Sequence, residues 1–315
     1  VAKWTDHMYI VAFDSTGGSE VKDKTAKYNN TVTKPSNPTR TGYTFAGWYK
    51  DEDCTTGQEW SFDTPVTGDV TLYAKWTAIK YDIKFDYNGG KIGSATYASV
   101  KADFDSYLTA PSTDGIAKTG YAFDKKWYTD EECTNEWNFA DDVVKGKMTL
   151  YAGWKINRYT VTFDTKGGSA VARIEVEYNG IIQESPETTK TGHAFGGWFT
   201  DETCTSTKKW KFGDSTSPTK VTENITLYAK WTANEYTVTY DPNGGKFGTD
   251  INPKDYSVEY DKVITDKEKP SDPKMTGYTF AYWCKDAECN TAWDFQNDKV
   301  TGDITLYAKW TINGY

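Results

Sequence analysis

The sequence predicts a string of four small, strand-rich domains. First, the hexapeptide TLYAKW recurs at Thr71–Trp76, Thr226–Trp231 and Thr305–Trp310, and once as TLYAGW at Thr149–Trp154. Second, the chain has 13 Trp, 23 Tyr and 14 Phe but only five Leu, a composition that favours strands over helices. Third, each unit begins with alternating apolar and polar residues, which is the period of a half-buried strand.

The repeat fixes the domain boundaries. The four copies end on Trp76, Trp154, Trp231 and Trp310, which are 78, 77 and 79 residues apart. A unit of this length is a domain rather than one turn of a solenoid. We divide the chain into residues 6–77, 78–155, 156–232 and 233–311, called repeats 1 to 4. We interpret residues 1–5 as the tail of a preceding repeat and 312–315 as the start of a junction to a further one, as in a piece excised from a larger protein.

Charge and hydropathy exclude two kinds of partner. The chain has 36 basic and 45 acidic residues, a formal net charge of -9. No basic run stands out that would bind phosphates, so we expect no nucleic acid partner. No apolar stretch approaches the roughly 20 residues that cross a bilayer, and no signal peptide precedes the repeats. We expect a monomer without membrane insertion, whose acidity favours solubility.

The first predicted element of each repeat is a strand such as Tyr159–Phe163, in which threonines alternate with larger apolar residues. It runs into a D-x-x-G-G sequence at Asp14–Gly18, Asp86–Gly90, Asp164–Gly168 and Asp241–Gly245. Paired glycines beside Asp or Asn favour the positive φ angles of a hairpin turn. A phosphate-binding loop is the alternative, but it would need a longer glycine fingerprint and a following helix.

A second strand such as Ile174–Tyr178 follows, and then a proline-containing connection of variable length, which indicates surface chain with at most one short helix. The third strand carries G-Y-x-F-x-G-W, where glycines allow the backbone to approach closely beneath the tryptophan. One extra residue before Trp127 predicts a β-bulge in repeat 2. An acidic loop with a cysteine, a W-x-F segment and the closing strand TLYAKW complete the repeat.

This order of motifs resembles the Listeria–Bacteroides repeat family, which is related to the internalin-type B repeat. The resemblance covers nearly the whole chain and recurs four times. It implies a small α+β domain of the β-grasp (ubiquitin-like) class, found in tandem in bacterial surface and secreted proteins. It implies neither an enzymatic activity nor a shared ligand site. Lys126, Tyr282, His193 and Gly153 depart from the motifs without affecting a predicted element.

The junctions have a fixed length. The first Tyr of the next repeat lies five positions after each closing Trp, as Tyr81 does after Trp76, and none of the four residues between them is Gly or Pro. Such a junction is not a flexible tether. We therefore expect an extended rod of domains that are each roughly 30 Å across.

Four cysteines occupy one equivalent position, six residues after a tryptophan: Cys54, Cys133, Cys204 and Cys289. One cysteine per domain cannot close an internal disulfide, so a half-buried apolar filler is favoured. Cys284 is a fifth cysteine. For Cys284 and Cys289, the alternative to an apolar filler is a disulfide across a tight loop. With only two unrelated histidines besides, we expect no metal site.

The acidic clusters Asp51–Asp53 and Asp130–Glu132 are the candidates for chemistry. A solvated turn is favoured for them, because calcium would need more oxygen ligands in a recognisable spacing. The sequence contains no nucleophile motif and no paired catalytic histidine. We therefore expect no enzyme, no catalytic residue and no cofactor.

Two functions remain open. Tryptophans at the same three positions of every repeat are more typical of a core than of a ligand platform. The candidate binding residues are the tyrosines of the closing strand, which lie on the face opposite its Leu and Trp: Tyr73, Tyr151, Tyr228 and Tyr307. The alternative is that the variable loop covers these tyrosines. The favoured function is a non-catalytic stalk or spacer of a bacterial cell-surface or secreted protein that contributes to adhesion. The alternative is a module that binds a glycan, or a host or matrix protein, by avidity.

Overall fold

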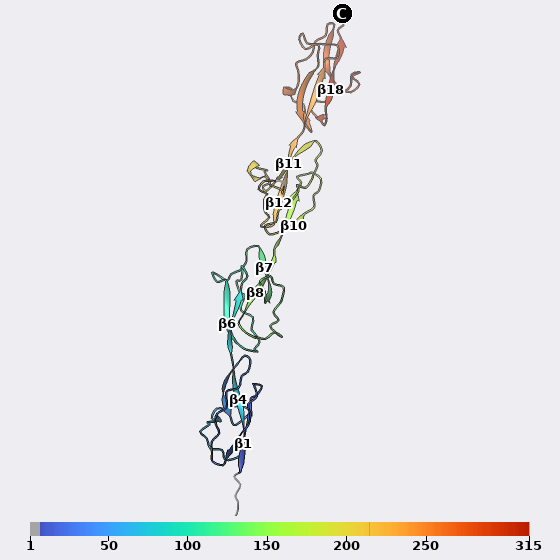
Figure 1. The fold of residues 1–315 in the computed structure, drawn as a ribbon. Helices are drawn as coiled ribbons and strands as arrows, with labels where there is room; N and C mark the ends of the chain where they lie inside the picture. Colours follow the sequence, from blue (N-terminus) through green and yellow to red (C-terminus); the bar gives the residue numbers. More distant parts are fainter. Residues whose placement is uncertain (1–6, 214, 315) are drawn as a thin grey trace, which may run out of the picture. The chain divides into compact units, whose positions relative to one another are not determined.

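In a computed structural model, residues 7–213 and 215–314 are described, and each repeat folds around its own four-stranded sheet (Figure 1). The chain divides into two compact units between Ile156 and Asn157. Each unit therefore holds two repeats. The proposed repeat tail at residues 1–5 lies outside the described residues.

The same strands recur in every repeat. Repeat 1 contains β1 (Met8–Asp14), β2 (Lys24–Lys27), β3 (Tyr43–Tyr49) and β4 (Val70–Ala78). Repeat 2 contains β5 (Lys80–Asp86), β6 (Tyr97–Asp103), β7 (Tyr121–Tyr128) and β8 (Met148–Ile156). Repeat 3 contains β9 (Arg158–Asp164), β10 (Ile174–Glu177), β11 (His193–Phe199) and β12 (Ile225–Ala233). Repeat 4 contains β13 (Glu235–Asp241), β14 (Lys254–Glu259), β16 (Tyr278–Cys284) and β18 (Ile304–Ile312), with a small ribbon of β15 (Lys262–Val263) and β17 (Lys299–Val300).

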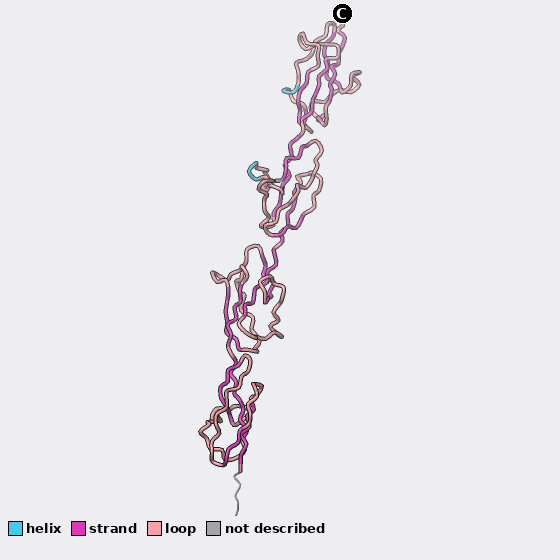
Figure 2. The backbone as a smooth tube through the Cα atoms, in the orientation of Figure 1, coloured by secondary structure: helices cyan, strands magenta, loops and turns pink. Residues whose placement is uncertain are grey.

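The expected α component of the fold is missing. Helical structure in the described residues is limited to two 3₁₀ turns, η1 (Ser206–Lys208) and η2 (Asp266–Glu268) (Figure 2). The connection between the second and third strands has no α-helix in any repeat. In repeat 1 that connection contains two prolines and several threonines, residues that oppose helix formation. The prediction of strand-rich repeats is confirmed. The α+β class is not, because the described residues contain strands but no α-helix.

All four sheets share one strand order. In repeat 1 the first strand β1 and the last strand β4 run parallel at the centre, with Phe13 opposite Leu72. The outer strands β2 and β3 add antiparallel to β1 and β4. The chain thus enters and leaves each repeat along the middle of its sheet.

The first tryptophan of each repeat forms the centre of its core. Trp198 is fully buried and meets Phe163 edge-to-face with ring centroids 4.9 Å apart, a favourable aromatic geometry. The backbone N–H of Trp210 donates to the carbonyl of Trp198 at 2.8 Å, which ties the W-x-F segment to the third strand. The equivalent tryptophans Trp48, Trp127 and Trp283 are also buried. The prediction of a tryptophan core is confirmed at this position.

The predicted β-bulge is confirmed and is more general than expected. In repeat 2 the register shifts between Phe123 and Trp127. The other repeats have a shorter shift before the tryptophan, at Phe45/Gly47, Phe195/Gly197 and Phe280/Tyr282. A bulge re-aims the residues that follow it, so it belongs to the motif itself and not to the extra residue of repeat 2.

The D-x-x-G-G turn has the predicted positive φ angles, 48° at Asn88 and 81° at Gly89. It does not join the two strands directly, however, because β5 ends at Asp86 and β6 begins at Tyr97. The hairpin prediction is confirmed, because β5 and β6 pair antiparallel with Asp86 opposite Tyr97. A further stretch of chain lies between the turn and the second strand.

The ring of the closing tryptophan packs on the second glycine of this turn. A Cβ on Gly90 would be 2.3 Å from the Trp154 ring. The Trp154 indole N–H donates to the carbonyl of Tyr87 in the same turn at 2.9 Å. Equivalent ring contacts are made by Gly18 with Trp76, Gly168 with Trp231 and Gly245 with Trp310. The close approach expected at the third-strand glycines thus occurs at the turn, because the parallel pairing brings the last strand beside the first.

Repeat 4 has a polar group where the other cores have none. Tyr240 replaces Phe13, Phe85 and Phe163, and it is fully buried. Its hydroxyl has no hydrogen-bond partner among the described residues. Burial raises the pKa of Tyr240 above its usual value of 10.0. A buried hydroxyl without a partner costs about 1–3 kcal/mol.

We expect Tyr240→Phe to stabilise repeat 4 by about 1 kcal/mol, because it removes a desolvated hydroxyl and keeps the ring. Since the folded-state pKa is raised, the wild-type protein loses stability as the pH rises above the unfolded value of 10.0. The variant should lack this part of the loss. Denaturant titrations near neutral pH and above pH 10 measure both effects, with Tyr236→Phe as the control. Equal stability of variant and wild type at both pH values would contradict the prediction.

Candidate functional site

The junctions between repeats are the most regular feature outside the cores. In the first unit only Ile79 separates β4 from β5, and in the second unit only Asn234 separates β12 from β13. Each closing strand therefore continues almost directly into the first strand of the next repeat. We call each such junction, with the residues that contact it, a joint.

The joint between repeats 1 and 2 is bonded on both sides. The backbone N–H of Ile79 donates to the carbonyl of Gly42 at 2.9 Å, and the N–H of Phe104 donates to the carbonyl of Ile79 at 2.8 Å. A Cβ on Gly42 would lie 2.2 Å from the Phe104 ring, so this ring rests directly on the glycine. The same ring meets Tyr43 edge-to-face with centroids 5.6 Å apart. The second repeat is thus packed on the third strand of the first.

The joint between repeats 3 and 4 has the same construction. The N–H of Asn234 donates to the carbonyl of Gly192 at 2.9 Å, and the N–H of Tyr260 donates to the carbonyl of Asn234 at 2.8 Å. A Cβ on Gly192 would lie 2.1 Å from the Tyr260 ring. His193 replaces the usual tyrosine and keeps the edge-to-face contact at 5.8 Å. Two independent copies of the joint therefore agree in detail.

A tight turn orients the aromatic residue of each joint. Phe104 and Tyr260 are followed by Asp105 and Asp261, which have φ angles of 68° and 62°. Asp and Asn tolerate this left-handed conformation better than most residues. This turn was not predicted, although it has a signal in the sequence, an aromatic residue followed by Asn or Asp after the second strand: Tyr28–Asn29, Phe104–Asp105, Tyr178–Asn179 and Tyr260–Asp261.

The four candidate binding tyrosines lie on the closing strands, one in each repeat, and all are half-buried. The loop with the cysteine lies over this face, since the Cys54 thiol points at the carbonyl of Tyr73 with Sγ 4.0 Å from the oxygen. In repeat 3 the Lys166 ammonium lies 5.1 Å from the Tyr228 ring centroid. Tyr73, Tyr151, Tyr228 and Tyr307 thus have protein neighbours, and no repeat contributes more than one of them.

The acidic loops are built as turns. The carboxylate of Asp130 accepts the backbone N–H of Thr134 at 2.8 Å and that of Asn135 at 2.8 Å. These bonds, the one from Thr134 first, hold the pKa of Asp130 below its usual value. The same bond from the residue four positions later is accepted by Asp51, Asp201 and Asp286. No group of three or more His, Cys, Asp or Glu in the described ranges could hold a metal ion.

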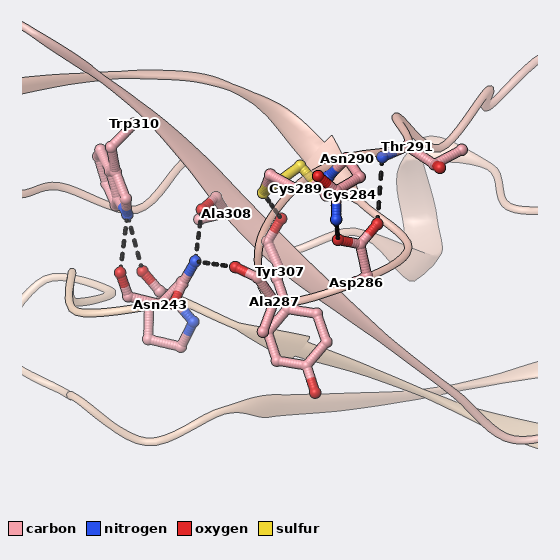
Figure 3. The surroundings of a disulfide bond; sticks show 11 residues. Asn243, Cys284, Asp286, Ala287, Cys289, Asn290, Thr291, Tyr307, Ala308 and Trp310 are labelled. Carbon is pink, nitrogen blue, oxygen red and sulfur yellow. Dashed lines mark hydrogen bonds between the residues drawn. A yellow bond between two sulfur atoms is a disulfide. The ribbon is translucent and has the colours of Figure 1, made fainter.

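The cysteine of each acidic loop sits in a left-handed conformation, with φ between 47° at Cys54 and 58° at Cys133. Cys54, Cys133 and Cys204 are free and half-buried. In repeat 4 a disulfide joins Cys284, at the end of β16, to Cys289, with Cα atoms 5.0 Å apart (Figure 3). This short cross-link ties the end of the third strand to the acidic loop.

We expect the denatured, unreduced protein to present three reactive thiols and the reduced protein five, because only Cys284 and Cys289 are paired. Alkylation followed by intact-mass measurement counts the thiols in each state, and peptide mapping locates the cross-link. A Cys284→Tyr variant, which restores the residue type of repeats 1 and 2, should expose four thiols without reduction. Five thiols in the unreduced wild type would contradict the pairing.

Neither histidine is placed for acid–base chemistry in the described part of the chain. His193 Nδ1 lies 2.8 Å from the carbonyl of Thr191, and His7 packs against the ring of Tyr9. No helix among the described residues is long and apolar enough to cross a membrane. The described residues thus form joints, turns and packed cores.

The recurring sheet and the joint define the class: a tandem-repeat protein built from small β domains. The sequence signature of the Listeria–Bacteroides repeat domain matches residues 9–75, 81–153, 159–230 and 236–309. The chain belongs to this family, with four copies in tandem.

Three relatives extend the comparison. A protein of Evansella cellulosilytica, named as a Gly-rich membrane protein, is 37% identical over 95% of this chain and 32% of its own length. A second protein of that organism, also named as a membrane protein, is 36% identical over 99% of this chain and 45% of its own length. Internalin H of Listeria monocytogenes is 37% identical over 49% of this chain and 25% of its own length. The chain spans less than half the length of each of these relatives.

Proposed function

We propose that this chain is a non-catalytic spacer of a bacterial surface protein, in which the joints hold successive repeats at a fixed spacing and angle. The observation that carries the proposal is the joint itself, repeated in both units with the same bonds. A linking residue bonded on both sides, with a ring packed on glycine, restricts bending far more than a free linker would. The family and the names of its relatives support a place at the cell surface.

The proposal includes the fold class. The strand order, with a central parallel pair and an antiparallel strand on each side, supports a β-grasp sheet in which a loop replaces the helix. We also propose that the functional form of the chain is an extended monomer. With domains roughly 30 Å across, four repeats would span about 120 Å.

Small-angle X-ray scattering of the chain tests this function. We expect the scattering of a rod whose cross-section matches one repeat, unchanged over a wide concentration range. A collapsed particle, or the broad distribution of a freely jointed chain, would overturn the spacer. Adhesion is tested separately, by binding of the chain to arrays of glycans and of matrix proteins. Its failure there would leave the spacer standing and remove the adhesive role.

The alternative function, binding by avidity through the repeated tyrosines, has weaker support. Tyr73, Tyr151, Tyr228 and Tyr307 are half-buried on a face that other side chains share. Rings used for stacking on sugars would need one free face. Replacing all four with phenylalanine or leucine should therefore leave any binding to an array unchanged.

A further inference from the structure

The acidic loop of repeat 4 is held to its sheet in a different way from those of the other repeats. Repeats 1 to 3 have an aromatic residue directly after the core tryptophan: Tyr49, Tyr128 and Phe199. Repeat 4 has Cys284 at this position, and its side chain is fully buried. Cys284 lies opposite Tyr307 in the sheet, as Tyr49 lies opposite Tyr73. Because directly opposite residues share a face, a sulfur replaces a ring on the face of the candidate tyrosines.

In repeat 1 the ring takes part in holding the loop. Tyr49 is buried, and the Lys75 ammonium lies 4.6 Å from its ring centroid. The same ammonium donates a hydrogen bond to the carbonyl of Cys54 in the acidic loop at 3.1 Å. Cation–π attraction holds a lysine over such a ring, so the ring, the lysine and the loop are connected. In repeat 3 Lys230 lies over the Phe199 ring in the same way, 5.5 Å from its centroid.

In repeat 4 a covalent bond replaces the ring. The disulfide joins Cys284, at the end of β16, to Cys289 in the acidic loop (Figure 3). A second connection comes from Asn243, whose Nδ2 donates to the carbonyl of Ala287 in the loop at 3.2 Å. Repeat 2 has an equivalent bond, from Asn88 Nδ2 to a carbonyl of its own acidic loop. The asparagine bond is therefore shared between repeats, whereas the disulfide is specific to repeat 4.

The loop lies against Tyr307 and is otherwise bonded to itself. Cys289 Sγ is 3.8 Å from the carbonyl oxygen of Tyr307. The Asp286 carboxylate accepts the backbone N–H of Asn290 at 2.9 Å and that of Thr291 at 3.1 Å (Figure 3). These two bonds shape the turn without connecting it to the sheet. Above its base, the loop is thus fixed to the sheet by the disulfide and by the asparagine bond.

One sulfur of the pair is more accessible than the other. Cys289 is 8% exposed and lies between the exposed residues Glu288 and Asn290, whereas Cys284 is 0% exposed. Exchange begins when a thiolate attacks a disulfide sulfur that it can reach. Attack from solution therefore falls on Cys289, and Cys284 is the sulfur that leaves.

We propose that this disulfide is a redox latch, which holds the acidic loop over Tyr307 when oxidised and releases the loop when a dithiol reduces it. The first thiolate of the dithiol bonds to the Cys289 sulfur, and Cys284 leaves as a thiolate and takes up a proton. The second thiol of the dithiol then displaces Cys289 as a thiol, and the dithiol becomes a disulfide. Two electrons and two protons thus pass from the dithiol to the two cysteines.

The released loop keeps its asparagine bond but loses its tie to β16, and no ring lies at that position to hold it. Tyr307 then becomes more exposed. The loops of repeats 1 to 3 do not respond to the dithiol, because their cysteines are free: Cys54, Cys133 and Cys204. This inference goes beyond the spacer function and does not rest on it.

The test compares the whole folded chain before and after treatment with dithiothreitol, and intact mass confirms that two further thiols have formed. Hydrogen exchange with mass spectrometry reports on the loop through the bonded amides of Cys289, Asn290 and Thr291. We expect these amides to exchange roughly tenfold faster after reduction, because the cross-link no longer restricts the open states of the loop. The loops of repeats 1 to 3 and strand β18 should keep their exchange rates.

A second measurement reports on the tyrosine itself. Hydroxyl-radical footprinting, after the dithiothreitol has been removed under nitrogen, measures the solvent exposure of each tyrosine side chain. We expect labelling of Tyr307 to rise on reduction. Labelling of Tyr73 and Tyr228 should stay constant, because their loops are held by rings and contain no disulfide.

Two matched variants separate the ring from the cross-link. Cys284→Tyr installs the residue of repeats 1 and 2, so its loop should exchange slowly with and without dithiothreitol. Cys284→Ser has neither a ring nor a cross-link, and its loop should exchange fast in both conditions. Circular dichroism checks the fold of each variant.

Three results would overturn the proposal: a disulfide that dithiothreitol leaves intact in the folded chain, loop amides that exchange equally in both states, or unchanged labelling of Tyr307. Loss of protection throughout β13 and β18 would also count against it, because the disulfide would then stabilise the whole repeat and not the loop alone. If a variant fails to fold, the oxidised and reduced forms of the wild-type chain still decide the matter.

Discussion

Replacing Gly90 with alanine should destabilise repeat 2 by about 3 kcal/mol. The added Cβ would lie 2.3 Å from the Trp154 ring, a distance that forces the ring away from the turn. Moving the ring breaks the bond from its indole N–H to the carbonyl of Tyr87. Overpacking of this kind costs about 1–3 kcal/mol, and a lost hydrogen bond in a part-buried site adds to it. Gly90 has no positive φ, so the effect isolates the contact from backbone strain.

Hydrogen exchange with mass spectrometry measures this effect repeat by repeat, which a single melting curve of a multidomain chain does not do. Peptides of repeat 2 should exchange faster, and those of repeat 3 should keep their wild-type protection. Gly146→Ala is the control within the same repeat, because a Cβ there meets nothing within 4 Å. Equal protection in the Gly90→Ala and Gly146→Ala variants would show that the tryptophan does not depend on the glycine.

Much of each sheet is predictable from local pattern. The alternation in Tyr159–Phe163 predicts a strand, and β9 covers it at Arg158–Asp164. The alternation in TLYAKW predicts that Leu72 and Ala74 share one face of the closing strand, and both are buried. These predictions succeed because strand periodicity depends on residues two positions apart.

Other features depend on contacts between distant residues and leave no such pattern. The parallel pairing of β1 with β4 brings Gly18 against Trp76, 58 residues away in sequence. Two glycines in a turn look the same whether they serve φ angles or a ring contact, and here Gly17 serves the first and Gly18 the second. The connection between the second and third strands varies in length among the repeats, and such variation indicates surface chain without determining whether that chain is helical.

The sequence predicts only part of the joint. The constant spacing from Trp76 to Tyr81 predicts a restricted junction, but nothing in the spacing identifies Phe104 as the residue that packs on Gly42. Phe104 comes just after β6 and looks like one more strand residue.

Replacing Phe104 with alanine should uncouple repeat 1 from repeat 2 while both remain folded. The ring rests on Gly42 and meets Tyr43, and it is absent from the buried core of repeat 2. Removing it deletes the aromatic contact across the joint, a loss of about 1–3 kcal/mol. The backbone bonds of Ile79 remain, so the two repeats stay connected but gain freedom to rotate.

Residual dipolar couplings measure this freedom directly, since two repeats held rigidly report one alignment tensor and two mobile repeats report different ones. We expect a single tensor for repeats 1 and 2 in the wild type and two in Phe104→Ala. Tyr107→Ala is the matched control, because Tyr107 is an aromatic residue of the same repeat with 64% exposure. Tyr260→Ala should produce the same separation for repeats 3 and 4, since Tyr260 rests on Gly192 as Phe104 does on Gly42. If the wild type already gives two tensors, the joints do not restrict motion, and the mechanical basis of a spacer is lost.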